Sequence, residues 1–287
     1  MCIRVLLVFV ILLSWSCNPF RTMRLASVAS ILEDVAKASA KSSEVEIVME
    51  GSAAYILLID GLLEEAPENR DLLVAAAQAY SSYAAAFVEG NDPDRARRLY
   101  LRARDYALRA LSHRKGFIRH VFEPYGEFVP YLQEIEKGDV PALFWAASSW
   151  ASWISRMGQS IAPLADLPKV VRMVERVIDL DEGFNYGGAH LFMGVYHSAR
   201  PKAYGGDPPR AKRHFDKAFA ISQGKYLMAY VFYARFYARQ IFDRELFVSS
   251  LRKVMESPAD EVPELTLLNT IAKRQAKELL SMADEYF

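Results

Sequence analysis

The sequence predicts an all-α protein in which pairs of helices follow one another along the chain. Of the 287 residues, 52% are hydrophobic, and Ala, Leu, Arg and Glu, which favour helices, are abundant. Segments with strand-like patterns are nearly absent. Apolar residues at relative positions 0, 4 and 7 recur in four separate segments. We therefore expect an α-solenoid, with another all-α bundle as the alternative.

The N-terminus has the anatomy of a signal peptide. Arg4 is followed by nine uninterrupted apolar residues, which are fewer than the roughly 20 of a membrane-spanning helix. Cys17 follows the small Ser16, an arrangement similar to the cleavage site of bacterial lipoproteins. We expect residues 1–16 to be removed, Cys17 to be lipidated, and residues 17–22 to form a tether. Ordinary secretion and an uncleaved anchor are the alternatives.

After the tether, residues 23–287 are predicted to form a single helical domain. Two N-terminal capping helices are expected within residues 23–66, ending at Ala66-Pro67. The repeat pairs are expected over residues 69–256, interrupted by an insertion at 112–138 that contains several Gly and Pro residues. A helix over 264–286 would cap the far end, as solenoids require.

Side-chain size at fixed spacing identifies the type of repeat. In the first pair, one helix carries Leu73, Ala76, Ala77 and Tyr80, and its partner, after Asn91-Asp92-Pro93, carries Ala96, Tyr100 and Ala103. These spacings resemble those of tetratricopeptide (TPR) repeats. Three further pairs are expected at 141–157 with 168–180, 185–199 with 208–221, and 226–241 with 244–255. Their second helices carry the residues Val170, Val174, Val177; Ala211, Phe215, Ala218; and Phe247, Leu251, Val254. The fold prediction is therefore a TPR-like α-solenoid of about four degenerate helix pairs with extra capping helices.

No catalytic or cofactor motif stands out. The five histidines do not form H-E-x-x-H, and His190 and His197 are two helical turns apart. The two Gly pairs belong to no phosphate-binding loop. Lys plus Arg and Asp plus Glu both total 35, which gives no general attraction to nucleic acid. We predict no enzyme, no cofactor and no metal. The alternative is an enzyme whose site is built from scattered residues such as His190, His197 and a carboxylate.

Aromatic residues crowd the first helices of the later pairs. A period of 3.6 residues cannot place all of them on one face, so some are expected to line a concave surface. They can fill a thick core, form a ligand cavity with Tyr hydroxyls as polar groups, or form a partner interface. The residues predicted to line a ligand or partner cavity are Trp145, Trp150, Trp153, Tyr186, His190, Tyr196, Tyr230 and Tyr233.

One block of the sequence resembles a known family. Gly187-Gly188-Ala189-His190 is followed by Tyr204-Gly205-Gly206-Asp207-Pro208-Pro209-Arg210-Ala211, with Phe215 and Ala218 in the next helix. Together with the leader and the TPR-like pairs, this block is similar to the T component of TPR-protein-associated TRAP transporters of spirochaetes and other bacteria. The resemblance implies a periplasmic lipoprotein, anchored to the inner or the outer membrane, that works beside a TRAP-type solute-binding protein. It also implies a homo-oligomer, with a trimer as the first expectation.

The predicted function is accordingly that of a non-catalytic accessory lipoprotein in secondary transport. The resemblance implies docking of the periplasmic solute-binding protein and a hydrophobic cavity or passage for ligand. A general TPR scaffold in envelope assembly, which captures a peptide in its groove, is the rival prediction.

Overall fold

The computed structural model describes residues 17–157, 164–199 and 206–287, which contain no strand. The chain divides into two compact units, residues 1–39 and 40–287. Helix α2 (Cys17–Ala40) carries one described ion pair, between Lys37 and Glu33 one turn apart. Residues 17–22, which we expected to form a tether, are helical.

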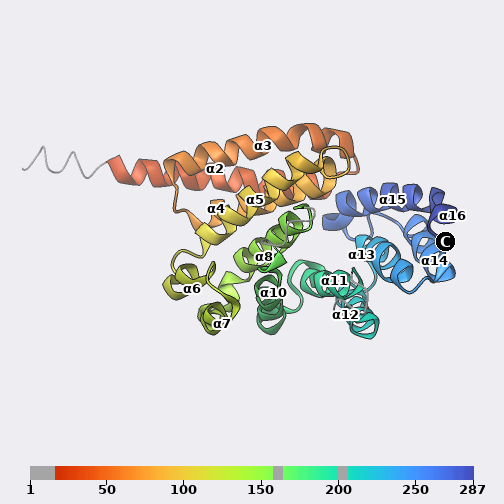
Figure 1. Cartoon of the computed structure of the whole chain (residues 1–287). Coiled ribbons are helices and arrows are strands. Elements are labelled where there is room, and N and C mark those ends of the chain that lie inside the picture. The colour runs from red at the N-terminus through yellow and green to blue at the C-terminus, as the bar shows by residue number, and fades with distance from the viewer. Residues whose placement is uncertain (1–16, 158–163, 200–205) are drawn as a thin grey trace, which may run out of the picture. The chain divides into compact units, whose positions relative to one another are not determined.

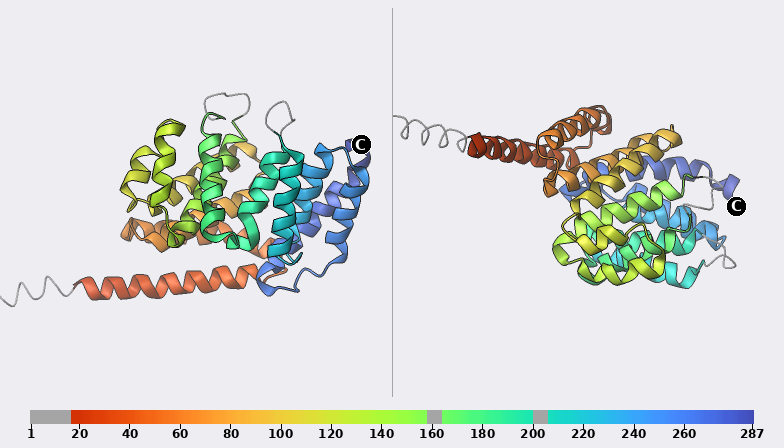
Figure 2. Two further views of the ribbon diagram at one scale, coloured as in Figure 1. Left: turned by 90° about the horizontal axis from the view of Figure 1, so that it is seen from below. Right: turned by 60° about the vertical axis from the view of Figure 1, so that its left-hand side comes forward.

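Residues 40–287 form a series of helices that pack in chain order (Figures 1 and 2). The series begins with α3 (Val45–Glu65), α4 (Arg70–Tyr83) with the π-helical η1 (Ala84–Val88), and α5 (Pro93–Ala110). It continues with α8 (Val140–Ile154), α10 (Leu167–Asp181), α11 (Phe184–Ser198) and α12 (Pro208–Ile221). It ends with α13 (Met228–Phe232), the π-helical η5 (Tyr233–Ala238), α14 (Arg244–Glu256), α15 (Thr266–Ser281) and α16 (Ala283–Tyr286), with the 3₁₀ turn η6 (Pro263–Leu265) before α15.

Aspartate caps fix where the second helices of three pairs begin. The side chains of Asp92, Asp207 and Asp243 each accept a hydrogen bond from the backbone N–H three residues later, at 2.8 to 3.0 Å. Pro93 and Pro208 occupy the following position, where the fixed φ of proline favours a helix. These local signals explain why the predicted starts of α5, α12 and α14 agree with the structure.

The 0, 4, 7 faces of the second helices are buried as predicted. All twelve side chains at these positions in α5, α10, α12 and α14 are at most 2% exposed. In the third pair, Gly194 on α11 supplies the notch for Phe215 on α12. A Cβ atom at Gly194 would lie 2.9 Å from two ring carbons of Phe215. Only a residue without a side chain permits this approach, so the small-and-large packing of the TPR pattern is present here.

The predicted insertion forms short helices rather than an open loop. It contains α6 (Lys115–His120), α7 (Tyr125–Phe128) and the 3₁₀ turns η2 (Val129–Glu134) and η3 (Lys137–Asp139). Asp139, 1% exposed, accepts hydrogen bonds from Arg70 at 2.6 Å and from Arg114 at 2.8 Å, and lies 3.1 Å from His113. This buried carboxylate connects the insertion to α4 at the start of the repeats.

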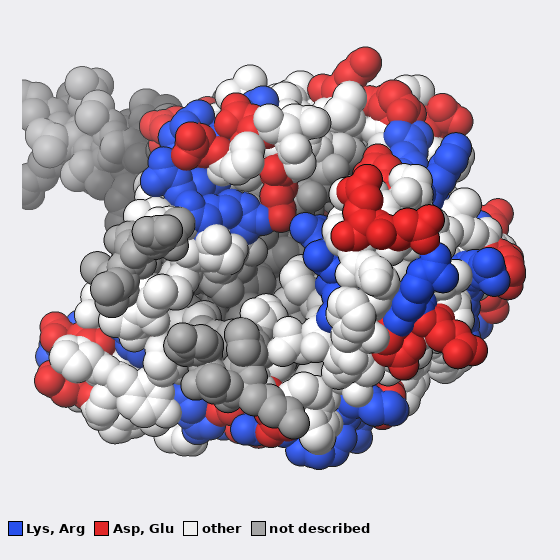
Figure 3. Space-filling model, turned by 45° about the vertical axis from the view of Figure 1, so that its right-hand side comes forward, with Lys and Arg blue, Asp and Glu red and all other residues white. Residues whose placement is uncertain are grey.

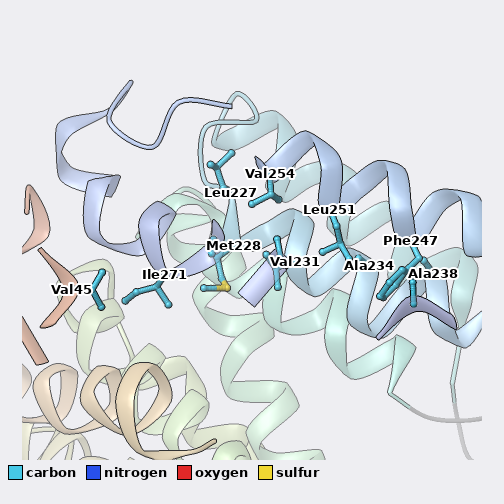
Figure 4. Packing of buried hydrophobic residues seen from close by; sticks show 13 residues of the cluster. Val45, Leu227, Met228, Val231, Ala234, Ala238, Phe247, Leu251, Val254 and Ile271 are labelled. Carbon is cyan, nitrogen blue, oxygen red and sulfur yellow. The ribbon is translucent and has the colours of Figure 1, made fainter. Parts of the chain in front are cut away.

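The first helix of the larger unit contacts the last long one. Val45 on α3 packs in the same buried cluster as Met228 of α13 and Ile271 of α15, as Figure 4 shows. Glu46 forms an ion pair with Arg274 of α15. The two helices expected to cap opposite ends of the array therefore pack against each other.

Candidate functional site

Four tyrosines gather where α11, α12 and α13 meet. Tyr230 stacks on Phe219 at 4.3 Å, and Tyr233 meets the same ring edge-on at 5.5 Å. Tyr186 lies 6.0 Å from Tyr226, and Tyr226 packs against the same hydrophobic cluster as Phe219. We call Tyr186, Tyr226, Tyr230, Tyr233 and Phe219 the tyrosine cluster. Three of its members, Tyr186, Tyr230 and Tyr233, are among the residues predicted for a cavity.

Strained backbone borders this cluster. Asn185 and Tyr186 have φ values of 50° and 57°, in the left-handed region that costs roughly 1–2 kcal/mol for residues other than glycine. Gln223 is left-handed as well, at φ 51°, and is followed by Gly224 at φ 71°. A Cβ atom at Gly224 would lie 2.9 Å from the Tyr230 hydroxyl. Strained residues cluster at functional sites more often than elsewhere, so this border is a reason to place the candidate site here.

Three hydroxyls of the cluster, on Tyr186, Tyr226 and Tyr233, have a raised pKa and stay protonated. Burial raises the pKa of Tyr226 to about 12, and burial together with the neighbouring Tyr237 raises the pKa of Tyr233 to about 12. Burial also raises the pKa of Tyr186 above its ordinary value. Tyr230 and Tyr186 are half-buried, and their rings are apolar with a polar end. Such a set can hold the apolar part of a molecule against the rings while the hydroxyls donate hydrogen bonds to its polar end.

Two helices that open a pair, α4 and α13, continue into a π-helical turn before the loop to the second helix of the pair. These turns are η1 after α4 and η5 after α13. In η5, Tyr233 and Tyr237 stack at 4.8 Å, and Phe215 meets Tyr233 edge-on at 5.1 Å. Turns of this kind are frequent at functional sites, and no signal in the sequence indicates them.

A histidine group joins α11 to α12. His190 and His214 approach each other with their Nδ1 atoms 2.9 Å apart, and His197 stacks on His214. Glu182 lies 3.3 Å from the other ring nitrogen of His190. Burial, followed by the charges of His190 and His197, lowers the pKa of His214 to about 4. The spacing of His190 and His197 along one helix did not reveal His214, which reaches them from α12.

The tryptophans predicted for the cavity lie in other surroundings. Trp150 is fully buried between the Arg104 guanidinium, 5.3 Å from its ring, and the Lys169 ammonium, 5.5 Å from it. Trp153 packs against the buried cluster that contains Tyr100 and is also within 5.5 Å of Arg104. Trp145 is half-buried and contacts Phe144 edge-on. The eight predicted residues therefore belong to separate groups on α8, α11 and α13 with η5. Tyr196, the last of them, is half-buried and contacts His197.

An open depression of about 630 Å³ lies beside η5. Its lining residues are Pro208, Pro209, Lys212, Tyr237, Gln240 and Ile241, none of which is among the eight predicted residues. Charged side chains of both signs are interspersed with large uncharged areas on the face shown in Figure 3. Within the described ranges, no three His, Cys, Asp or Glu side chains are grouped so that they could hold a metal ion.

Comparison with known proteins identifies the family of this chain. The family model "TRAP transporter T-component" matches residues 41–287. The chain belongs to this family. An uncharacterised protein of Treponema pallidum (strain Nichols) is similar to this T component. It is 22% identical over 270 residues, which is 88% of this chain and 84% of the relative.

Membership makes this T component an accessory part of TRAP transport associated with the cell envelope. Among the described helices, none has the length and apolar character needed to cross a membrane. The resemblance in the sequence depended on the block that begins at Tyr204. Tyr204 and Gly205 lie outside the described residues, whereas Asp207 caps α12 and Phe215 fills the notch of α11.

Proposed function

We propose that this T component docks the periplasmic solute-binding protein of its transporter and presents the tyrosine cluster to a hydrophobic ligand. The observation that supports this most directly is the pairing of half-buried Tyr186 and Tyr230 with left-handed turns at residues 185–187 and 223–224. The turn at 223–224 is the left-handed end of α12, where the Gly224 N–H donates to the Phe219 carbonyl at 2.8 Å. The left-handed Asn185 and Tyr186 are strained, and a site that leaves aromatic rings within reach of a ligand gives a reason for that strain.

The proposal narrows the predicted cavity. Tyr186, Tyr230 and Tyr233 remain in it because their rings contact the same cluster. Trp150 has a structural role in our proposal, since its side chain is fully buried, whereas Tyr230 is half-buried although Lys253 lies 4.8 Å from its ring. The Tyr186 and Tyr233 hydroxyls, whose pKa is raised, suit an apolar molecule with a carbonyl or carboxylate end better than a cation.

We further propose that Cys17 is acylated and anchors the protein to a membrane from the periplasm. Two acyl chains or one chain with a second contact give stable anchoring without a spanning helix. Mass spectrometry of the N-terminal peptide from native membranes would show a diacylated or triacylated Cys17. An unmodified chain that begins at Met1, or cleavage at another residue, would contradict this proposal.

The ligand proposal is tested with Tyr186→Ala and Tyr230→Ala, and with Tyr125→Ala as the control. Tyr125 is 44% exposed on the insertion and lies outside the tyrosine cluster. Each protein is purified from its own membranes, and the lipophilic molecules that co-purify are extracted from it and quantified per mole of protein. We expect both cluster variants, but not the control, to lose most of the retained molecule. Equal retention in all three would refute the site, and co-purification with envelope assembly factors alone would favour the scaffold role.

A further inference from the structure

An arginine row runs along the exposed face of α5. Arg95, Arg102 and Arg109 are spaced by seven residues, and Arg98 lies between the first two. All four are exposed. Seven residues of helix span about 10 Å, so the row is about 21 Å long. Helix α5 has six arginines against two aspartates, a net charge of +4, whereas the whole chain has 35 basic and 35 acidic residues.

Tyrosine rings hold three of these arginines in place. The Arg95 guanidinium carbon is 5.7 Å from the centre of the Tyr83 ring. The Arg102 guanidinium lies 5.1 Å from Tyr80 and 5.6 Å from Tyr106. The Tyr106 ring also supports Arg109 at 5.6 Å. Stacked guanidinium groups lose less conformational freedom on binding, so this row is prepared to bind carboxylates.

Hydrogen bonds add to this order without using all the donors. Arg102 donates to Asp60 at 3.0 Å, and Arg109 donates to the carbonyl of Pro67 at 2.7 Å. Asp60 also accepts from Tyr80 and Tyr106, at 2.6 and 2.7 Å. By contrast, Arg98 makes no recorded ion pair or hydrogen bond with any described residue. Within the described part of the chain, no group accepts from its five donors, so Arg98 is the least explained member of the row.

An exposed leucine lies beside this surface on α3. Leu57 is 70% exposed and lies one turn before Asp60, the residue that binds Arg102. Leu58 and Ile47, also exposed, lie on a side of α3 turned by roughly 140–160° from Asp60 and are not part of this surface. Arginine together with large apolar side chains is typical of the centre of protein interfaces, whereas single exposed leucines need no explanation.

From these contacts we propose that the arginine row of α5 and Leu57 of α3 form the docking surface for the solute-binding protein, which binds through a carboxylate-bearing face. This inference depends on the proposed function. A protein partner fits better than an anionic membrane because Asp60 and Asp105 interrupt the row and Glu64 lies exposed at the end of α3. Separate carboxylates can avoid these acidic groups, but a continuous layer of phosphates cannot.

The test uses the acylated full-length protein in detergent and the purified solute-binding protein of the same transporter. The Kd is measured by calorimetry at 50 and 300 mM NaCl for wild type, Arg95→Glu/Arg98→Glu and Leu57→Asp. Arg252→Glu is the charge control, because Arg252 is exposed on α14 and forms no hydrogen bond or ion pair with a described residue. Leu164→Asp is the apolar control, since Leu164 is 47% exposed before α10. Circular dichroism confirms that each variant is folded.

We expect the double reversal to weaken binding by about tenfold or more at 50 mM NaCl and to reduce its salt dependence. Leu57→Asp should weaken binding at both salt concentrations, and more at 50 mM NaCl because the new carboxylate also repels the carboxylate-bearing face; the controls should bind like wild type. If wild type binds and the variants bind with the same Kd, the proposed docking surface is wrong, but the proposed function still stands. No wild-type binding would overturn both. If the double reversal loses binding to vesicles of phosphatidylcholine and phosphatidylglycerol but binds the solute-binding protein like wild type, the arginine row binds a membrane and the proposal is wrong.

Discussion

Replacing Gly194 by alanine tests whether the helix notch holds the third pair together. The new methyl group would lie 2.9 Å from two carbons of the Phe215 ring and 3.1 Å from a third. Favourable carbon contacts lie at about 3.5–4.0 Å, so the ring or the helix must move by about 0.5–1 Å. Phe215 is fully buried, with Tyr233 and Tyr237 against its ring, and has little room to move.

Two opposing effects set the size of the change. Overpacking of a filled core costs about 1–3 kcal/mol. Replacing glycine by alanine inside a helix contributes about 0.5–1 kcal/mol of stability in the other direction. We therefore expect Gly194→Ala to lower the free energy of unfolding by about 0–2.5 kcal/mol. Gly61→Ala on α3 is the matched control, because a Cβ atom there meets nothing within 4 Å, and it should stabilise the protein by about 0.5–1 kcal/mol.

Urea unfolding followed by circular dichroism measures both variants under the same conditions. Phe215→Leu, alone and combined with Gly194→Ala, completes a double-mutant cycle. The smaller leucine should relieve the clash, so the double variant should be more stable than the sum of the single effects by at least about 0.5 kcal/mol. If Gly194→Ala is as stable as Gly61→Ala, or if the cycle shows additive effects, the notch does not govern this helix pair.

Three further predictions follow from buried polar groups. The protein should lose stability as the pH falls from 6.5 towards 4, because the unfolded state takes up protons on histidine before His214, whose pKa is lowered to about 4; His214→Gln should flatten this dependence in urea titrations at several pH values. Asp139→Ala leaves Arg70 and Arg114 without their buried carboxylate and should lower the free energy of unfolding in urea by about 2–4 kcal/mol. A decrease below about 0.5 kcal/mol would contradict this role of Asp139. Lys169→Met should cost about 1–3 kcal/mol because two backbone carbonyls, at residues 121 and 123, lose their donor, and an unchanged melting temperature would count against this role.

Local signals determined most of the helix pairs. Two helix starts are indicated by an aspartate followed by a proline, at Asp92-Pro93 and Asp207-Pro208. The buried face of α12 is indicated by the 0, 4, 7 spacing of Ala211, Phe215 and Ala218. These features depend on residues within one or two turns of each other. They can therefore be recognised without knowing what lies next to each helix.

The site depended on neighbours that are distant in the sequence. Trp150 and Tyr230 are similar members of aromatic-rich helices, and each has a cation at its ring. Packing of the neighbouring helices buries Trp150 fully, whereas Tyr230, stacked on Phe219, is only half-buried. Likewise, the left-handed turn at Tyr186 cannot be recognised from its side chain, because tyrosine is not a residue that favours positive φ.

The sequence by itself determined the helix pairs, the buried faces and the family, because short-range spacing, caps and composition carry that information. Tertiary structure alone decided that α3 contacts α15, that His214 joins the other histidines, and that Asp60 connects three helices. These contacts join residues that are 20 to 228 positions apart. Side-chain chemistry makes such contacts favourable, but only the packing of the helices brings the partners within reach.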